Sequence, residues 1–383
     1  MSGNITRRGA HSWRLKFEAG ERDPITGKRQ TRYVTVRGTK KDAQRELIRL
    51  LAEVENGTAV DPSTLTVTEY IRGWLDCADH LAGKTRDRYR ALAEQQIIPH
   101  LGSIALQKLR PRHVADWHAT LLKSGGKDGA PLSARTVGHA HRLLHTVLAR
   151  AAGLEVVGRN VVGMVRPPKV DAEEVEILTA AEVGEVLTRL AGHRLFPIAV
   201  LVLGTGLRRG ELCELRWGDI NMDSGSLRVE RAVEQTRAGL RVKAPKTRHG
   251  RRMIALPSSV IDALRAQWLE QLETRFALGM GRTGTDDLVF PLPDGAQWSP
   301  DYLSRVWRLA MVALGLPRVG LHSLRHAHAS ALIASGVDVL TISRRLGHAS
   351  PAFTLTVYGH LFADTDAAAA KAIDITLGAK SPV

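Results

Sequence analysis

The sequence has little cysteine and no long apolar segment. Its 383 residues include only Cys77 and Cys213, too few for a disulfide framework and without the paired spacing of a zinc site, so we expect both to be small core residues. The longest apolar run, Leu195–Leu203, is much shorter than the roughly 20 residues of a membrane-spanning helix, and the chain begins without the apolar stretch of a signal peptide. These absences argue against a disulfide-rich secreted protein and against a membrane protein, and we expect a soluble, cytoplasmic protein.

The chain has instead an excess of positive charge. Lysine and arginine total 54 and aspartate and glutamate 39, which gives a formal net charge of +15. The net charge is +6 in residues 1–60, +6 in residues 61–172 and only +3 in the remainder. Such an excess predicts a polyanionic partner, either a nucleic acid or an anionic membrane surface. The length allows two or three domains, and most of the affinity for the polyanion should lie in the first half of the chain.

Residues 1–58 are predicted to form a small αβ module. The alternation at Trp13, Leu15 and Phe17 and a second stretch around residues 33–36 predict strands, and a helix should begin after Thr39. Three basic side chains on or beside these strands are candidate DNA contacts: Arg14, Lys16 and Arg32. A short basic sheet fits a DNA groove, although a solvated face on a protein-binding module has the same pattern.

Residues 59–168 show only helical patterns and predict a bundle of four or five helices. Two of its segments, residues 84–96 and 134–152, carry basic residues beside apolar stripes. Their candidate phosphate contacts are Arg86, Arg88, Arg135 and Arg142. A charged helix face is often only solvated, but two such faces in one small basic bundle favour contact with a DNA backbone.

A third domain is predicted over residues 173–383. It follows a linker at Arg166–Lys169, where consecutive prolines resist helix formation. Leu195–Leu203 predicts a fully buried helix, and a β insertion is expected at about residues 227–256. Further helices are expected over residues 180–190, 261–277, 303–314, 323–334 and 339–345.

Arg208 lies in the first candidate motif of this domain. Gly204 and Gly206 should end the buried helix and place Arg208 in the first turn of the next one. There its guanidinium and the free backbone N–H groups can bind one anion together. The alternative is a structural ion pair with Glu211 or Glu214.

His322 and Arg325 form a second candidate motif near the start of a predicted helix. Their spacing of three places both side chains on one face. A guanidinium can hold two phosphate oxygens, and an imidazole can exchange a proton near neutral pH. With His326 and His328 the cluster could instead bind a metal ion, but no acidic or cysteine ligand lies nearby to complete such a site.

A lysine, a histidine and a tyrosine complete the candidate set. Lys246 lies in a basic run at a predicted β turn, from which it could approach a departing alkoxide, and Lys243 competes for this role. His348 follows Gly347, a predicted helix C-cap, and the helix that starts next presents Tyr358.

Together these motifs resemble the tyrosine recombinases of the phage integrase family. The resemblance is strongest in residues 204–217 and 321–359, where T-G-L-R-R-G-E-L, H-S-L-R-H, L-G-H and V-Y-G-H occur in the family's order. It implies an arm-type DNA-binding domain at residues 1–58, a helical core-binding domain at residues 59–168 and a mixed α+β catalytic domain at residues 173–383 with a C-terminal helical tail. The expected fold is multidomain and mainly α, with small β elements.

The resemblance also implies a role for each residue. Tyr358 would be the nucleophile that forms a 3′-phosphotyrosyl intermediate, and Glu211 would support Arg208. The activating set would be Arg208, Lys246, His322, Arg325 and His348. Ionising a free phenol at pH 7 costs about 4 kcal/mol, so a proton acceptor is needed, and His322 is the candidate, with Lys246 the candidate donor to the leaving 5′ oxygen. This set requires no metal ion and no other cofactor.

The activity that the resemblance implies is integration and excision of a mobile element by DNA strand transfer. The partners would be double-stranded DNA attachment sites, three further copies of the chain in a homotetramer, and accessory proteins for excision or DNA bending. The tail, Leu361–Leu377, would dock on a neighbouring subunit or pack on its own domain. Two alternatives stay open: a type IB topoisomerase, against which the separate N-terminal module argues, and a non-catalytic DNA-binding accessory protein, against which the complete set of active groups argues.

Overall fold

The computed structural model describes most of the chain, in two compact units, Met1–Asp171 and Ala172–Val383. The described residues are 3–22, 29–55, 60–170, 176–244, 250–316, 319–362, 370, 373–374 and 376–377. Among the described residues, the first unit contains two separate hydrophobic cores, and the second has one large core and a smaller cluster that includes Tyr358. The expected multidomain, mainly α fold with small sheets is confirmed. The boundaries of three functional domains stay a prediction.

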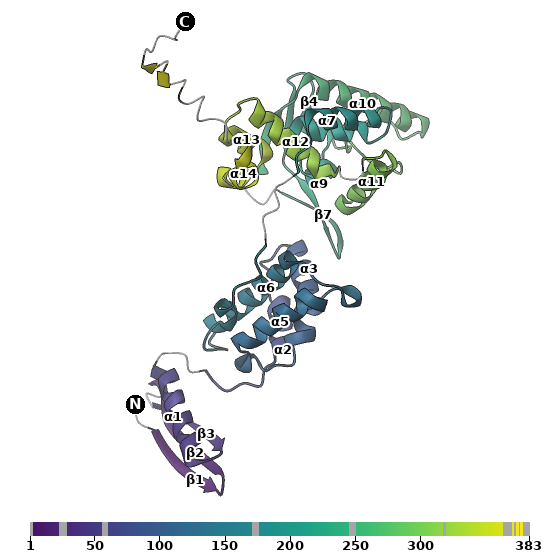
Figure 1. Ribbon diagram of the computed structural model, residues 1–383. Coiled ribbons are helices and arrows are strands. Elements are labelled where there is room, and N and C mark those ends of the chain that lie inside the picture. The colour runs from purple at the N-terminus through teal and green to yellow at the C-terminus, as the bar shows by residue number, and fades with distance from the viewer. Residues whose placement is uncertain are drawn as a thin grey trace. The chain divides into compact units, whose positions relative to one another are not determined.

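A three-stranded antiparallel sheet and one helix form the N-terminal module (Figure 1). Its elements are β1 (Gly3–Gly9), β2 (Ser12–Arg22), β3 (Arg29–Arg37) and α1 (Lys40–Glu55). Leu15 and Phe17 of β2 pack against Ala43 and Leu47 of α1 to form the core. The sequence did not predict β1, because Ile5 is the only large apolar residue among its seven.

Five helices form a bundle in the second half of the first unit. They are α2 (Val67–Asp76), α3 (Gly83–Leu92), α4 (Ile98–Leu101), α5 (Pro111–Ser124) and α6 (Ala134–Gly153), with a π-helical turn, Ala93–Ile97, between α3 and α4. The Trp117 indole N–H donates to the carbonyl of Gln96 at 2.7 Å inside this core. Cys77 lies exposed just after α2, so the prediction of a core position is wrong for it and right for Cys213.

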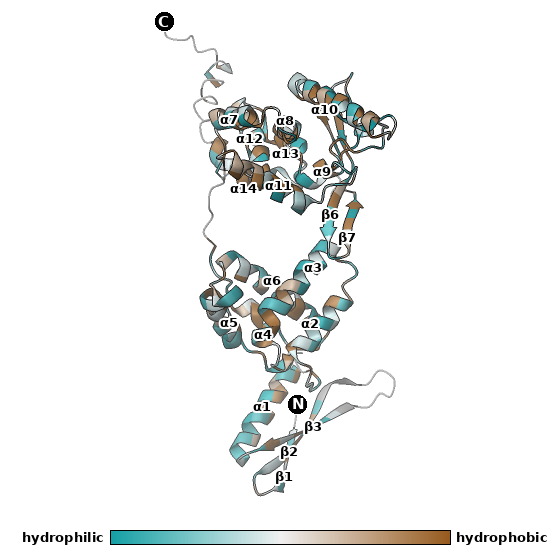
Figure 2. Cartoon of the chain, turned by 90° about the vertical axis from the view of Figure 1, so that its right-hand side faces the viewer, coloured by the Kyte–Doolittle hydropathy of each residue, from teal (hydrophilic) through white to brown (hydrophobic). Residues whose placement is uncertain are grey.

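The second unit is organised around the buried helix that the sequence predicts. Its helices are α7 (Ala180–Leu190), α8 (Phe196–Thr205), α9 (Arg209–Cys213), α10 (Ser258–Ala277), α11 (Pro300–Ala313), α12 (Leu321–Ala334), α13 (Val339–Leu346) and α14 (Pro351–Tyr358). Helix α8 consists almost wholly of apolar residues and packs against α7, α10 and α12. Figure 2 colours these helices by the hydropathy of each residue. This packing fixes the C-terminal end of α8 beside the first turns of α12.

Two small antiparallel elements make up the predicted β insertion. β4 (Ile220–Asn221), β5 (Ser226–Val229) and β8 (Arg252–Ala255) form one sheet, and β6 (Ala232–Thr236) and β7 (Gly239–Lys243) form a hairpin. Strand β8 bears on the site because it carries Arg252.

The outcome of two predictions depends on which residues the structure describes. The predicted tail, Leu361–Leu377, lies mostly outside them, and so does its docking. Among the helices of the described part, none has the length and apolar character that crossing a bilayer requires.

Candidate active site

The first predicted arginine lies where one helix ends and another begins. Helix α8 ends at Thr205, and Gly206 follows in the left-handed region with φ of 66°, which glycine adopts without steric cost. Arg208 is the N-cap residue of α9, and its backbone N–H donates to Glu211 Oε2 at 2.9 Å. The local sequence therefore anchors the Arg208 backbone at the start of a helix.

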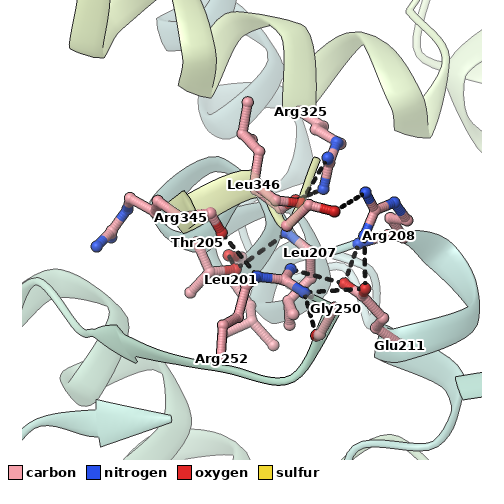
Figure 3. Close-up of polar contacts among 12 residues, drawn as sticks. Leu201, Thr205, Leu207, Arg208, Glu211, Gly250, Arg252, Arg325, Arg345 and Leu346 are labelled. Carbon is pink, nitrogen blue, oxygen red and sulfur yellow. Dashed lines mark hydrogen bonds and ion pairs between the residues drawn. The ribbon is translucent and has the colours of Figure 1, made fainter. Parts of the chain in front are cut away.

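Glu211 is a buried carboxylate that two arginines share (Figure 3). Oε1 accepts from Arg208 Nη1 at 2.9 Å and from Arg252 Nη1 at 3.0 Å, and Oε2 accepts from Arg252 Nη2 at 2.8 Å. Burial alone would raise the pKa of Glu211, but the hydrogen bonds and charge of Arg252 and the charge of Arg208 hold that pKa below its ordinary value. Glu211 is therefore ionised and fixes both guanidiniums.

Three arginines converge on the C-terminal end of α13. The helix ends in a Schellman motif, in which Gly347 has φ of 65° and the N–H groups of Gly347 and His348 donate to the carbonyls of Arg344 and Ser343. The next three carbonyls each accept from a different guanidinium: Arg345 O from Arg252 Nε at 2.7 Å, Leu346 O from Arg325 Nη2 at 2.8 Å and Gly347 O from Arg208 Nη2 at 2.6 Å. The backbone of one helix end thus holds three positive charges together.

Arg325 is deeply buried, with 3% of its surface exposed. It is the fifth residue of α12, and besides the Leu346 carbonyl its guanidinium donates to the carbonyl of Gly206. Burial, followed by repulsion from Arg208 and Arg252, lowers the pKa of Arg325 to about 9, so the group is still protonated at neutral pH. Its hydrogen bonds among the described residues go to carbonyls, and this leaves its positive charge to act on an incoming anion.

His348 follows the end of α13 and is held by α14. Its Nδ1 forms a hydrogen bond with the hydroxyl of buried Thr354 at 2.8 Å, and its ring lies edge-on to Phe353 with centroids 4.9 Å apart. Burial and the charges of nearby arginines, Arg325 first, lower the pKa of His348 to about 3. The imidazole is neutral at physiological pH, and when Nδ1 accepts from the Thr354 hydroxyl, Nε2 carries the one N–H and can donate it to an anion.

Tyr358 ends α14 and is 1% exposed. Its hydroxyl forms a hydrogen bond with Nδ1 of His326 at 2.7 Å, and the two rings lie edge to face with centroids 5.6 Å apart. Burial raises the pKa of Tyr358, and the charge of Arg325 offsets part of that rise. The phenol is therefore protonated in this structure and contacts His326.

His322, the predicted proton acceptor, lies beside that pair rather than on the phenol. It occupies the first turn of α12, and its ring meets the ring of His326 edge-on with centroids 4.7 Å apart. Desolvation by the surrounding protein, followed by the charges of His326 and Arg325, lowers the pKa of His322 to about 4. The side chain of His322 nevertheless keeps an exposed surface. No hydrogen bond joins His322 to Tyr358, both of which the structure describes.

The two predicted lysines differ in what the structure shows. Lys246 lies outside the described residues, so its role stays a prediction. Lys243, at the end of β7, forms an ion pair with the buried carboxylate of Glu234. That partner holds Lys243 on the hairpin.

The predicted DNA contacts of the N-terminal module lie on two faces of the sheet. Arg14 and Lys16 alternate with buried Leu15 and therefore point away from α1. On that outer face the Arg14 guanidinium lies 4.7 Å from the Tyr33 ring centroid. Arg32 pairs with Phe17 on the opposite face. Its guanidinium donates to the carbonyl of Val60 at 3.0 Å and lies 2.6 Å from a carboxylate oxygen of Asp61.

The bundle brings three of its four predicted contacts together. Arg88 of α3 and Arg135 and Arg142 of α6 all lie close enough to His139 to lower its pKa, after burial as the largest cause. Arg142 also forms a hydrogen bond with His139 at 2.5 Å. Arg86 points elsewhere and forms an exposed ion pair with Asp79 at 3.4 Å. The result is a cationic surface built from α3 and α6.

Among the described residues, the positive charge gathered at the end of α13 comes from arginines. In the described part of the chain, no three His, Cys, Asp or Glu side chains are grouped so that they could hold a metal ion. The arrangement of guanidiniums, neutral imidazoles and a buried phenol is suited to a phosphodiester, in which non-bridging oxygens carry the charge.

Comparison with known families identifies this arrangement. The profile described as "Phage integrase family" matches residues 170–364, and the profile described as "Phage integrase, N-terminal SAM-like domain" matches residues 60–122. The chain belongs to the phage integrase family. It is a tyrosine-type site-specific DNA recombinase, as the sequence motifs predict.

Relatives of this integrase-family chain match most of its length. An integrase from Streptomyces ambofaciens is 30% identical over 331 residues, which cover 84% of this chain and 82% of the relative. The integrase of Mycobacterium phage L5 is 29% identical over 293 residues, with 76% and 74% covered. A XerC-like tyrosine recombinase from Caldanaerobacter subterraneus is 26% identical over 345 residues, with 84% and 86% covered.

Solved structures share the fold of this integrase-family chain at low identity. The Tn1549 transposon integrase in complex with a circular intermediate DNA has a TM-score of 0.68 and 20% identity, covering 81% of this chain and 99% of that one. A lambda integrase tetramer bound to a Holliday junction has a TM-score of 0.55 and 20% identity, covering 91% and 96%.

Sequence reasoning missed two residues of this integrase-family site. In the sequence Arg252 is one member of a basic run, and nothing in that run separates it from its neighbours, because its partner Glu211 lies 41 residues earlier. His326 is one of several histidines at a helix start. Its spacing of four from His322 was the available signal, since that spacing places both rings on one helix face.

Proposed function

We propose that this site cleaves one DNA strand by attack of Tyr358 on a phosphodiester and forms a 3′-phosphotyrosyl intermediate. The observation that carries the proposal is the convergence of Arg208, Arg325 and Arg252 on one helix end, within the same unit as a buried tyrosine. A covalent intermediate of this kind retains the energy of the broken bond, so strand rejoining needs no nucleotide cofactor.

The arginines have different roles in this proposal. Arg208 is the more accessible, with 39% of its side chain exposed, so it can reach a phosphate from the surface. Arg325 is fixed in the interior, and its charge attracts the non-bridging oxygens as phosphorus becomes five-coordinate. Arg252 and Glu211 position Arg208 and do not contact the phosphate. His348 donates a hydrogen bond to the same oxygens as a neutral imidazole, and His322 lies near enough to do likewise.

Two proton transfers complete the cleavage. The phenol must lose its proton, and the candidates to accept it are His322 and His326, both on α12. The 5′ oxygen must gain a proton as its bond to phosphorus breaks, and Lys246 is the proposed donor. The ion pair with Glu234 supports Lys246 over Lys243 for this role, because Lys243 already has a buried partner.

The first unit supplies the proposed contacts with double-stranded DNA. Arg14, Lys16 and Tyr33 form a basic and aromatic face on the N-terminal sheet, and the cationic surface of α3 and α6 suits a phosphate backbone. Arg86, Arg32 and Lys243 are weaker candidates, since each has an acidic partner in the structure. These placements support an arm-type DNA-binding domain at residues 1–58 and a core-binding domain at residues 59–168, as predicted.

The proposed working assembly is a homotetramer on two attachment sites. Recombination exchanges four strands, and one tyrosine cleaves one strand, so four active sites are needed. The lambda integrase tetramer bound to a Holliday junction has the same fold and supports this number. Because the substrate is chromosomal and mobile-element DNA, the protein would act in the cytoplasm of the host cell, with accessory proteins for excision or DNA bending.

Replacement of Tyr358 by phenylalanine tests the proposed chemistry. On a nicked suicide substrate the wild type should accumulate a covalent protein–DNA adduct, and Tyr358→Phe should form none while binding the site as tightly. Equal adduct yield from the variant would remove Tyr358 from the mechanism. Two plasmids that each carry one cognate site then separate a recombinase from a type IB topoisomerase, since only the recombinase joins them.

A further inference from the structure

The hydroxyl of Tyr358 is enclosed together with one particular histidine. Tyr358 is 1% exposed, and Nδ1 of His326 lies 2.7 Å from its oxygen. His326 is itself partly buried on α12, one residue after Arg325. Neither the sequence motifs nor the set of groups in the proposed mechanism assigns it a definite function.

We propose that His326 is a catalytic residue whose Nδ1 accepts the phenolic proton of Tyr358 as the tyrosine oxygen attacks phosphorus. The proposal rests on the proposed role of Tyr358 as nucleophile. The O–H bond of Tyr358 breaks, and its proton moves to Nδ1 while the tyrosine oxygen bonds to phosphorus. The P–O5′ bond breaks with its electron pair on the 5′ oxygen, which takes a proton from a separate donor. In the rejoining step His326 returns its proton to Tyr358.

Geometry favours His326 over His322 for this step. A base must lie within about 2.6–3.2 Å of the atom that holds the proton, and His326 meets this condition whereas His322 makes no hydrogen bond to Tyr358 in the described structure. His322 instead lies edge-on to His326, with ring centroids 4.7 Å apart, which limits rotation of the His326 ring. His322 therefore helps to orient the base.

The electrostatic environment of Tyr358 explains why its ionisation needs a base. Burial raises the pKa of Tyr358, so the free phenol is harder to ionise here than in water. Burial and the charge of Arg325 lower the pKa of His326, so its imidazole is neutral and has a lone pair available at neutral pH. Arrival of a phosphate would offset the charge of Arg325 and make protonation of His326 easier, which couples proton transfer to substrate binding.

Two substitutions at position 326 separate proton transfer from positioning. Asparagine places an amide oxygen near the position of Nδ1, so His326→Asn keeps a hydrogen-bond acceptor for the phenol but cannot take its proton. His326→Ala removes both functions. We expect both variants to form the covalent adduct about 100-fold more slowly at pH 7 in single-turnover assays on a nicked substrate, the lower end of what a positioned base contributes. His322→Asn is the matched comparison on the same helix.

The pH profile is the readout that a structural role would not change. Without an internal base, hydroxide must remove the proton, so the rates of His326→Asn and His326→Ala should rise about 10-fold per pH unit between pH 7 and pH 9. The wild-type rate should be flat over that range, because neutral His326 is already present. His322→Asn should be slower than the wild type but equally flat.

A sulfur-substituted substrate assigns the proton transfer to the nucleophile or to the leaving group. A 5′-bridging phosphorothiolate leaves as a thiolate and needs no proton, so it should restore cleavage to Lys246→Ala but not to His326→Asn.

Restored cleavage in His326→Asn, or a wild-type rate with a flat pH profile in that variant, would overturn the proposal. Should either variant unfold, the wild-type profile decides. Its rate must be flat between pH 7 and pH 9, because the pKa of His326 is lowered from its ordinary value of 6.5 and the imidazole is already neutral there. A wild-type rate that rises about 10-fold per pH unit over that range would contradict an internal base. Adducts formed by Tyr358→Phe would instead refute the proposed function itself.

Discussion

The two units hold their arginines in different ways. In the helical bundle, ion pairs such as Arg86 with Asp79 and Arg72 with Glu94 are exposed on both sides, and each arginine has a carboxylate partner in water. In the second unit, Arg252 and Glu211 are 6% and 5% exposed, and backbone carbonyls supply most of the other partners. Exposed pairs exchange readily with phosphates and salt, whereas the buried cluster keeps a fixed geometry without DNA. The fixed arrangement of the second unit suits catalysis, whereas the exposed pairs of the bundle contribute little to stability.

The sharpest test of this contrast removes one carboxylate from each unit. Glu211→Gln leaves Arg252 buried without its charged partner, and we expect the unfolding free energy to fall by about 3–5 kcal/mol. The matched variant Glu94→Gln, in the exposed pair with Arg72, should show no measurable change in urea unfolding. Equal effects of the two variants would show that burial of the Glu211 cluster has no energetic consequence.

Acid should also reduce the stabilisation that the Glu211 carboxylate gives the wild-type protein. The pKa of Glu211 is held below its ordinary value of 4.5, so its stabilising effect is fully present above that pH and is lost as pH falls through the folded-state pKa. The difference between wild type and Glu211→Gln should therefore narrow in acid.

Two glycines with positive φ give a second, smaller comparison. A Cβ on Gly206 would lie 2.7 Å from Leu346 Cδ2 and 2.8 Å from His328 Cδ2, whereas a Cβ on Gly129 in the first unit meets no atom within 4 Å. Gly129→Ala should cost only the backbone strain of about 1–2 kcal/mol. Gly206→Ala adds overpacking and should cost about 2–4 kcal/mol in total. It should also slow adduct formation, because the Gly206 carbonyl accepts from Arg325.

The smallest expected effect on stability comes from the exposed arginines, whose contribution should appear in the salt dependence of DNA binding. Replacing Arg88, Arg135 and Arg142 together by alanine should leave thermal unfolding almost unchanged. The slope of log K against log salt should become shallower by roughly 0.9 for each phosphate that the protein no longer neutralises. Arg265→Ala, an exposed arginine on α10, is the control and should leave the slope as it is. An unchanged slope in the triple variant would show that the cationic surface of α3 and α6 does not bind phosphate.

The sequence predicted local features of the fold well and tertiary ones less well. Helix α8 follows from an apolar run, and Gly206 ends it as predicted. Gly204, which was also expected to end the helix, lies inside it, and Arg208 is the N-cap of α9 rather than a residue of its first turn. Strand β1 was missed because its pairing with β2, rather than apolar content, creates it. Arg252 was missed because the basic residues of one run look equivalent until the fold brings one of them to Glu211.

The choice of histidine also depended on three-dimensional structure. The predicted base was His322, and His326, four residues later, lies on the same side of α12. Only the orientation of α14 against α12 decides which ring meets Tyr358, and no spacing within either helix encodes that orientation. The faces of the N-terminal sheet, by contrast, follow from alternation, and counting from Leu15 separates Arg14 and Lys16 from the core face.

The carbonyls at the end of α13 constrain how this enzyme can be varied. These carbonyls belong to the main chain, so side-chain substitutions on the outer side of α13 leave them in place. That side of the helix is therefore open to redesign. An insertion or deletion of one residue within residues 339–347 would instead rotate the helix end and disconnect Arg208, Arg252 and Arg325 at once. Chimeras between relatives should therefore be joined outside this segment, with α13 and its three arginines taken from the same parent.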